Sequence, residues 1–229
     1  MSALAIFVKT PGLSVVKSRL AAGTGAERAA DCHVRCAQSV AAVAVQAGIG
    51  PVYWAVAEAA GLNDARWAGL PRLLQSGHGL GERMRSVHDQ LCQRHGAGIL
   101  IGADLPQLEP RHLQAAAHHL RAGPGRGVLG PASDGGFWLF GSNVSLSPAI
   151  WDQPHYGGAG VAADFVRAIG KQLNWLQLDT RCDLDEPHDL DAVIDELRRL
   201  PAAHPVQADL LKWLSALRHS LEPGLRSQP

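Results

Sequence analysis

Apolar residues occur along the chain in two patterns, short continuous runs and longer stretches with helical spacing. Runs typical of buried strands occupy residues 3–8, 52–57, 72–74, 98–103 and 173–178. Helical spacing predicts helices over residues 27–46, 80–94, 109–121, 161–171, 187–200 and 207–221. Residues 127–131 and 136–140 are two more apolar segments, which form either a hairpin or two strands flanking a loop. This alternation predicts an α/β fold with a mostly parallel sheet covered on both faces.

No internal repeat or low-complexity linker divides the chain, so we expect one domain. A chain of 229 residues can form a single large α/β domain. We assign residues 1–200 to this domain and residues 201–229 to a C-terminal helix and tail, of which the tail from Glu222 to Pro229 is expected to be frayed. The last helix packs either on the domain or on a second subunit, so a homodimer is possible.

Composition and charge exclude several classes of protein. Hydrophobic residues make up 46% and charged residues 18%, which is typical of a soluble globular protein. Basic and acidic residues balance at 21 each, so nothing global points to nucleic acid or to an anionic membrane, and any anion site is a local cluster. No stretch reaches the roughly 20 apolar residues of a membrane span, and no signal peptide is evident. We expect a cytoplasmic protein.

Cysteines and histidines give no obvious metal motif. Cys32 and Cys36 are four residues apart, so they share a helix face, and we interpret them as free thiols rather than as zinc ligands or a disulfide. The 11 histidines are scattered. His33, His118 and His119 lie in predicted helices and are expected at the surface.

The segment ILIGADLPQL ends an apolar strand in Asp104. An unpaired carboxylate is costly to bury, so this residue needs an explanation. It either starts a turn or caps the next helix, or it holds a metal ion at a nucleotide site. In parallel sheets ligands bind at the carboxyl ends of strands, where Asp104 is expected together with Lys9 and Asp134.

The segment CDLDEPHDL supplies further carboxylates. Mg²⁺ prefers hard oxygen ligands and takes one or two carboxylates besides substrate phosphates, so Asp104 alone does not make a site. Asp183 and Asp185 are two residues apart and would point the same way in an extended segment. Pro187 opens a predicted helix, however, so Asp185 or Glu186 is alternatively an acid favoured by the helix dipole.

A basic loop, KTPGLSVVKSRL, follows the first strand. It carries Lys9, Lys17 and Arg19, while Pro11 and Gly12 make it turn-prone. It is neither a Walker loop nor a Rossmann glycine motif. Lys as a point charge and Arg as a bidentate fork suit a phosphate cradle. An ordinary solvated basic loop is the alternative.

Two glycine-containing loops are further candidates. QSGHGLGERM, residues 75–84, places glycines before a helix N-terminus, which suits an anion or a ribose edge. In GPASDGGFWLFG, Asp134-Gly135-Gly136 forms a predicted turn. Asp134 is therefore either a plain turn residue or part of a substrate pocket. No nucleophile elbow of the G-x-S-x-G type is present, so a serine hydrolase is unsupported.

Taken in order, KTPGLSVVKSRL, GLGERM, IGADLPQL, GPASDGGFWLFG and DLDEPHDL resemble the bacterial MobA-like glycosyltransferase family of the nucleotide-diphospho-sugar transferase superfamily. The order is similar, more loosely, to the phospholactate guanylyltransferases. The likeness runs from about residue 4 to residue 195. It implies a single Rossmann-like three-layer domain of the glycosyltransferase A type. It also implies a nucleotide held by the first loop and Mg²⁺ or Mn²⁺ held by Asp104.

The resemblance also implies roles for individual residues. Asp183 and Asp185 match an acidic pair that completes the metal site, and Lys17 and Arg19 match the K-x-R of the phosphate loop, so these two cations and Asp104 are the expected catalytic residues. The expected nucleotide-binding residues are Lys9, Pro11, Gly12, Lys17, Arg19, Gln75, Gly81 and Arg83. The expected acceptor-binding residues are Asp134, Gly135 and Gly136.

Three functions follow from these features. The first is metal-dependent glycosyl transfer from a sugar nucleotide to a small acceptor. The second is nucleotidylyl transfer from a nucleoside triphosphate to a phosphorylated small molecule, which the paired cations would also suit. The third is a non-catalytic nucleotide-binding module. Two departures from relatives favour this third function: Leu13 and Ser14 replace a Pro-Gly pair, and Gly79 replaces an aspartate.

Overall fold

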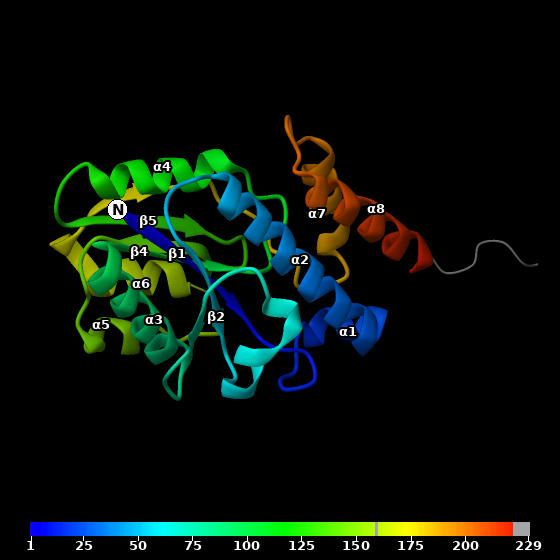
Figure 1. Cartoon of the computed structure of the whole chain (residues 1–229), viewed down its shortest axis with the longest axis horizontal. Helices are drawn as coiled ribbons and strands as arrows, with labels where there is room; N and C mark the ends of the chain where they lie inside the picture. The colour runs from blue at the N-terminus through cyan, green and yellow to red at the C-terminus, as the bar shows by residue number, and fades with distance from the viewer. Residues whose placement is uncertain (159, 222–229) are drawn as a thin grey trace, which may run out of the picture.

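A seven-stranded sheet forms the middle layer of the molecule in a computed structural model that describes residues 1–158 and 160–221 (Figure 1). Its strands, in chain order, are β1 (Ser2–Val8), β2 (Val52–Val56), β3 (Arg72–Leu74), β4 (Ala97–Gly102), β5 (Arg126–Pro131), β6 (Phe137–Ser142) and β7 (Asn174–Gln177). Across the sheet the order is β3-β2-β1-β4-β6-β5-β7. Only β6 runs antiparallel, between β4 and β5, so the mostly parallel sheet is confirmed among the described residues. Of the two alternatives for the fifth and sixth strands, the hairpin is correct.

Helices cover both faces of the sheet. They are α1 (Ser18–Thr24), α2 (Ala26–Gln46), α3 (Leu80–His95), α4 (Pro110–Arg121), α5 (Pro148–Asp152), α6 (Val161–Ile169), α7 (Asp189–Arg198) and α8 (Pro205–Ser220), and three 3₁₀ turns lie at Ala59–Asn63, Ala65–Trp67 and Gly170–Gln172. The helices α2 and α4 lie on one face, whereas α3, α5 and α6 lie on the other (Figure 1).

The alternation of side chains along β1 explains these two faces. Leu4 and Ile6 enter the core beneath α2 and α4, whereas Ala3 and Ala5 enter the core beneath α3. All these side chains are fully buried. A strand enclosed on both faces reads as a continuous apolar run, which is the pattern seen in the sequence.

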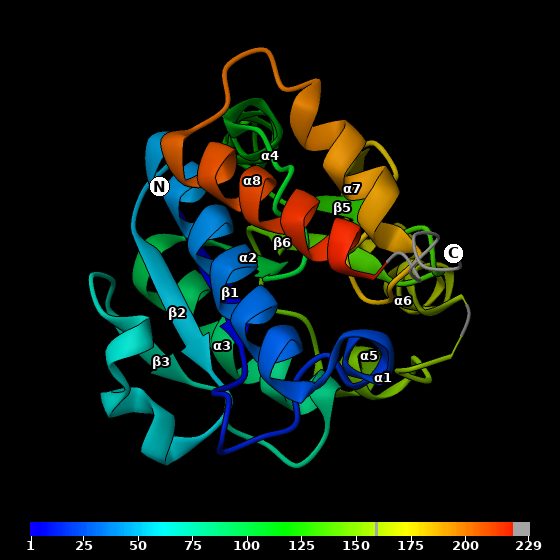
Figure 2. The same ribbon diagram turned by 90° about the vertical axis from the view of Figure 1, so that its right-hand side faces the viewer.

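A third core joins the C-terminal helices to the domain. The helices α7 and α8 pack beside α2 (Figure 2), and Leu214 of α8 is fully buried there. The last predicted helix therefore packs on the domain in this chain. Cys32 and Cys36 face the same core as free thiols with their sulfurs 3.9 Å apart, which confirms their shared helix face. The tail expected to be frayed lies outside the described residues.

The sequence pattern did not predict α1 and α5, and it placed the start of α7 slightly too early. The two missed helices span seven and five residues, which is too short for a helical period to be visible. The helix α7 begins at Asp189, two residues after the proline used to predict its start. No helix among the described residues is long and apolar enough to cross a membrane.

Candidate functional site

The candidate residues gather at the carboxyl edge of the sheet, where β1 and β4 end. In the sheet β2 lies on one side of β1 and β4 on the other, so the crevice between β1 and β4 is a topological switch point, the usual place for a ligand in open α/β sheets. Lys9 follows β1, and Asp104 lies two residues after β4. Because β6 is antiparallel, the turn that carries Asp134 also reaches this edge.

A buried ion pair joins the first loop to the end of β4. Lys17 Nζ lies 2.6 Å from Asp104 Oδ1, and the Lys17 side chain is only 2% exposed. Burial alone would lower the pKa of Lys17, but the Asp104 carboxylate raises it above the usual range. Burial would likewise raise the pKa of Asp104, but Lys17 and His33 hold it well below its usual range. Both groups are therefore charged at neutral pH.

Lys17 adopts an unusual backbone conformation to make this contact. Its φ of +44° lies in the left-handed region, and no other non-glycine residue within 1–158 and 160–221 has a positive φ. Such a conformation costs of the order of 1–3 kcal/mol outside glycine and persists where the surroundings enforce it. Here the Lys17 ammonium also donates to the Leu184 carbonyl, so it is held from two segments. Strain of this kind clusters at functional sites.

The acidic segment at residues 182–186 is fastened beside Asp104. The backbone N–H of Leu184 donates to the Asp104 carbonyl at 2.9 Å. The Asp189 carboxylate accepts the backbone N–H groups of Asp185 and Glu186 at 2.9 and 2.7 Å. These bonds hold the acidic segment at the mouth of the crevice.

Neither proposed capping role is found. The next helix after Asp104, α4, is capped by Glu109, and the acids in the first turn of α7 are Asp189 and Asp191. Asp185 and Glu186 instead pair with Arg19, whose Nη1 lies 2.8 Å from Glu186 Oε1. The interpretations of Asp104 and of Asp185 or Glu186 as helix-start acids are therefore wrong.

Four carboxylates influence one another here. Burial, followed by the charges of Asp134, Asp104 and Asp185, raises the pKa of Asp183 to about 7. Such a hard-oxygen set with excess negative charge has the donor chemistry that suits a divalent cation. Among the described residues, however, no three ligand-type side chains are already arranged as a metal centre. The donor chemistry fits, while Lys17 occupies the place beside Asp104.

His33 also belongs to this site, so its expected place at the surface is wrong. It is 5% exposed; its Nε2 lies 3.0 Å from the Lys9 carbonyl oxygen and its Nδ1 lies 3.7 Å from Asp104 Oδ1. His33 follows Cys32 on the buried face of α2. The position of His33 next to Cys32 in the helical pattern is the sequence signal that could have located it in the site. By contrast, His118 is exposed, as expected.

Lys17, Arg19, Asp104 and Asp185 border one cavity of about 560 Å³, which we call the charged cavity, whereas Asp183 lines a separate cavity of about 200 Å³ that shares Arg19 and Asp185 with it. The lining residues of the charged cavity are Phe7, Val8, Lys9, Val15, Val16, Lys17, Ser18, Arg19, His33, Gln75, Leu80, Asp104, Gly157 and Asp185. Gln75 is buried and donates to the carbonyls of Val8 and Ala55 at 3.2 and 2.8 Å. Its amide therefore fixes the ends of β1 and β2 at the cavity wall.

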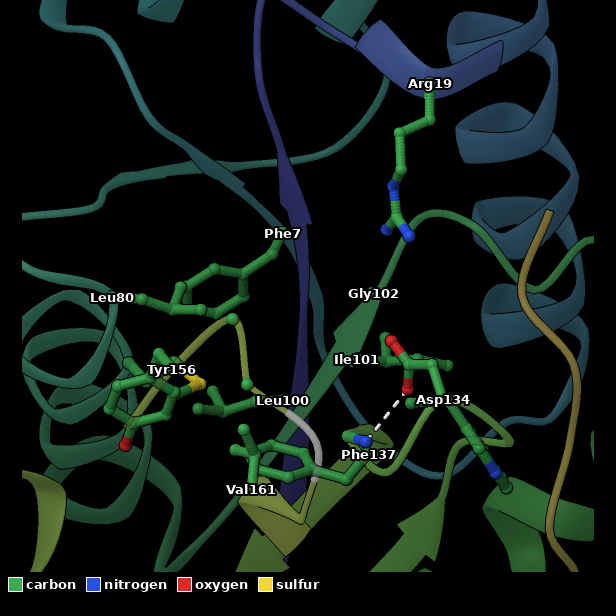
Figure 3. Close-up of a pocket in the computed structure, with 15 residues that line it drawn as sticks. Phe7, Arg19, Leu80, Leu100, Ile101, Gly102, Asp134, Phe137, Tyr156 and Val161 are labelled. Atoms are coloured by element: carbon green, nitrogen blue, oxygen red, sulfur yellow. Dashed lines mark hydrogen bonds between the residues drawn. The ribbon is translucent and has the colours of Figure 1, made fainter. Parts of the chain in front are cut away.

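A larger cavity of about 700 Å³ adjoins the charged cavity, and we call it the apolar cavity (Figure 3). Its lining residues are Phe7, Arg19, Leu80, Met84, Leu100, Ile101, Gly102, Asp134, Gly136, Phe137, Trp138, Tyr156, Gly157, Gly158 and Val161. Asp134 Oδ1 accepts the Gly136 N–H at 2.8 Å, and Gly135 has φ of +90°. Asp134 is thus both a turn residue and part of the cavity wall.

Other predicted nucleotide-binding residues have structural explanations. Gly12 has φ of +90° in a turn closed by the Leu13 and Ser14 N–H groups on the Thr10 carbonyl, and Pro11 lies in the same turn. Arg83 Nε donates to the Gly77 carbonyl at 3.2 Å and so holds the glycine-rich loop.

Gly81 allows two helices to approach each other closely. A Cβ at this buried position would lie 2.3 Å from the Trp151 carbonyl oxygen, so the glycine permits α3 to pack against α5. Helix packing thus gives one reason for a glycine here, and the nucleotide contact expected of Gly81 stays a prediction.

Solved structures share this fold. A Desulfovibrio desulfuricans G20 protein provisionally classed as a nucleotide-diphospho-sugar transferase is 25% identical, with a TM-score of 0.83 over 96% of this chain and 97% of that one. A CMP:2-keto-3-deoxy-manno-octonic acid synthetase solved with CTP is 14% identical, with a TM-score of 0.52 over 84% and 97%. A cytidylyltransferase from Leptospira borgpetersenii is 9% identical, with a TM-score of 0.50 over 100% and 98%.

The first of these structures supports the nucleotide-diphospho-sugar transferase superfamily, but not the MobA-like branch in particular, and the other two share the fold. The fold, a single α/β domain of this type, is confirmed. No curated protein matches the chain. The sequence profile of DUF2064, described as an uncharacterized protein conserved in bacteria, matches residues 33–157, more than half of the 229 residues, and the chain therefore belongs to the DUF2064 family.

Proposed function

We propose that the protein is a divalent-metal-dependent transferase that acts on a nucleotide-activated donor. One observation carries the proposal. At the switch point of the sheet, the cations of the first loop and the carboxylates of two other segments meet as the buried pair Lys17–Asp104 and the exposed pair Arg19–Asp185. A buried ion pair often gives little net stability compared with an apolar packing, so this arrangement favours a functional reason.

A donor with its metal would replace the partners in these two ion pairs. Donor phosphates would take Lys17 and Arg19 as partners, and Asp104, Asp183 and Asp185 would hold Mg²⁺ or Mn²⁺. Every charge would exchange an internal partner for one on the ligand, so none would be left buried and unpaired. The bound metal supplies charge neutralisation on the donor phosphates. Lys17 and Arg19 stabilise the same charge on the leaving group.

Glycosyl transfer from a sugar nucleotide is the leading reaction. The carboxylate cluster and two cations suit a diphosphate, and Asp134 lies on the wall of the adjoining cavity, where an acceptor would bind. Lys9, Gln75 and Phe7 line the charged cavity on the β1 side, which suits the nucleoside.

Nucleotidylyl transfer from a nucleoside triphosphate is a second candidate. Lys9, Lys17 and Arg19 all border the charged cavity, and three cations supply more positive charge than a diphosphate requires. Product identity separates the two reactions. Release of pyrophosphate would support nucleotidylyl transfer, and release of a nucleoside diphosphate would support glycosyl transfer.

A thermal-shift screen of nucleotides and sugar nucleotides, with and without Mg²⁺ or Mn²⁺, tests the shared proposal. A ligand that binds only the folded state raises the melting temperature by mass action. We expect at least one nucleotide to stabilise the chain in a metal-dependent way, and Asp104→Asn to abolish that dependence. Asp195→Asn, at an exposed acid of α7, is the control. Unchanged metal dependence in Asp104→Asn would refute the metal assignment.

A further inference from the structure

The apolar cavity identifies the class of acceptor, an inference that rests on the proposed transferase function. Four residues line both cavities: Phe7, Arg19, Leu80 and Gly157. The two cavities are thus continuous at the place where donor and acceptor would meet. A cavity of about 700 Å³ is within the size range of small-molecule sites.

The wall of this cavity is divided into an apolar side and a polar side. In Figure 3 the side chains of Phe7, Leu80 and Leu100 gather on one side with those of Tyr156 and Val161. Arg19 and Asp134 lie on the other side (Figure 3). The Tyr156 hydroxyl donates to the Trp151 carbonyl at 2.9 Å, so it is the ring that the cavity meets. An occupant therefore needs an apolar body and a polar end.

The charge on the polar side selects the kind of polar end. Among the described residues that line this cavity, Arg19 is the one cation; its guanidinium pairs with Asp185 and Glu186 and would pair with the donor phosphates in the proposed complex, so it is not free for the acceptor in either case. Asp134 contributes a carboxylate. An acceptor with its own phosphate would place a second anion beside Asp134, where no unshared cation offsets the repulsion between the two like charges. A hydroxyl, by contrast, can donate to the carboxylate.

We propose that the acceptor is an uncharged alcohol or phenol with an apolar, ring-sized body, whose hydroxyl lies at Asp134. In transfer, the bond between the sugar carbon and the nucleotide phosphate oxygen breaks, and the acceptor oxygen bonds to that carbon. The hydroxyl proton passes to Asp134, and the nucleoside diphosphate leaves with the electron pair. The class of reaction that consumes the product is therefore one that acts on apolar glycosides.

A matched pair of probes tests this class. We would saturate the full chain with the nucleotide and metal found in the thermal-shift screen, so that the phosphate site of the charged cavity is filled, and then titrate it by calorimetry with 2-naphthol, with 2-naphthyl phosphate and with glucose. The first two share a planar apolar body and differ in the phosphate, and glucose has hydroxyls without that body. We expect 2-naphthol to bind at least about tenfold more tightly than either other probe, a difference of about 1.4 kcal/mol. Equal or tighter binding of the phosphate, or no binding of 2-naphthol, would overturn the proposal.

Two matched substitutions locate the binding. Leu80 is 48% exposed at the start of α3 and lines both cavities, whereas Val45 is 56% exposed on α2 and lines neither. We expect Leu80→Lys to weaken 2-naphthol binding by about tenfold and to improve binding of the phosphate, while Val45→Lys changes neither. Unchanged binding in Leu80→Lys would show that the probe binds elsewhere and would overturn the assignment.

The nucleotide screen separates this inference from the proposed function. If nucleotides bind with a metal but naphthol does not, only the acceptor class fails. If no nucleotide binds, the transferase proposal fails, whatever the result with naphthol.

Discussion

Two regions of this molecule surround their polar groups in opposite ways. We call Lys17, Arg19, Asp104 and Asp185 the charged edge; these groups come from loops and helix ends and neutralise one another. By contrast, His88 of α3 lies in an aromatic core with Phe140 of β6, Trp151 of α5 and Phe165 of α6, whose neighbouring ring centroids are 4.9–5.6 Å apart.

The two regions differ in what surrounds their titratable side chains. In the aromatic core the Ser142 hydroxyl lies 3.0 Å and the Cys92 sulfur 3.5 Å from His88 Nε2. The rings of Phe140 and Trp151 pack against the imidazole. In the charged edge Lys17 has a left-handed backbone and its ammonium is buried. The aromatic core is therefore organised for stability, whereas the ion pairs of the charged edge are organised to be replaced by contacts with a ligand. Substitutions should separate effects on the free energy of unfolding from effects on ligand binding.

The largest effect on stability is expected in the aromatic core. Phe140 is fully buried and contacts the rings of His88, Trp151 and Phe165. Phe140→Ala should lower the free energy of unfolding by about 3–5 kcal/mol, because it removes ring contacts and leaves a cavity. Denaturant unfolding measures this loss. Nucleotide affinity of the folded variant should stay as in the wild type, and a large loss of affinity would break the comparison.

The next effect concerns the buried pair of the charged edge. Lys17→Met and Asp104→Asn each leave a partner uncompensated and should each lower the free energy of unfolding by about 3 kcal/mol. The double variant removes both charges and should lose about 0.5–3 kcal/mol less than the sum of the two. A double-mutant cycle by denaturant unfolding measures this coupling. Strict additivity would show that the pair is not coupled.

All three variants of this cycle should also lose metal-dependent nucleotide binding, which Phe140→Ala should keep. Calorimetric titration with the nucleotide found in the thermal-shift screen is the check. Retained binding in the double variant would remove the charged edge from the proposed site.

The sequence predicted the regular parts of the charged edge better than its contacts. It placed β1 and β4, and with them Lys9 and Asp104, because a strand enclosed on both faces is a continuous apolar run. The ordered motifs indicated that Lys17 and Arg19 belong near Asp104, and the structure brings all three together.

What the sequence did not predict depends on contacts between distant segments. The pair between Lys17 and Asp104 forms because the chain turns through an unusual φ at Lys17, which no residue pattern announces. His33 is buried because α2 presents the face that carries Cys32 to the core, and polarity alone suggested the surface. The close approach of α5 to Gly81 is likewise a contact between distant segments that the sequence did not predict.

A pH titration contrasts the two regions further. Burial lowers the pKa of His88 to about 4, from an ordinary value near 6.5. As the pH falls below about 6.5, the unfolded chain takes up a proton at His88 that the folded chain does not, so the His88 contribution to stability falls until the pH reaches about 4, while Asp183, whose pKa is raised to about 7, contributes in the opposite direction. The His88 contribution should fall by about 1.4 kcal/mol for each pH unit in this window. Denaturant unfolding across this range measures it.

His88→Gln is the matched variant for that titration, because the amide can still bond Ser142 but does not titrate in this range. The difference in free energy of unfolding between the wild type and His88→Gln should therefore change by about 1.4 kcal/mol per pH unit between about pH 6.5 and 4, while Asp183 contributes the same slope to both proteins. An identical slope in the wild type and in His88→Gln would show that His88 does not carry the effect.

The smallest effect on stability is expected at the exposed end of the charged edge. Arg19 is 57% exposed, and exposed ion pairs contribute at most about 1 kcal/mol, so Arg19→Ala should lower the free energy of unfolding by less than that. Its effect on nucleotide affinity should be about tenfold to a hundredfold, since a charge-assisted hydrogen bond to phosphate contributes about 1.5–3 kcal/mol. Arg198→Ala, at an exposed pair with Asp195 on α7, should change neither quantity. A loss of stability in Arg19→Ala without a loss of affinity would make Arg19 a structural residue, and the distinction between a core that stabilises and an edge that exchanges partners would then fail at its most exposed member.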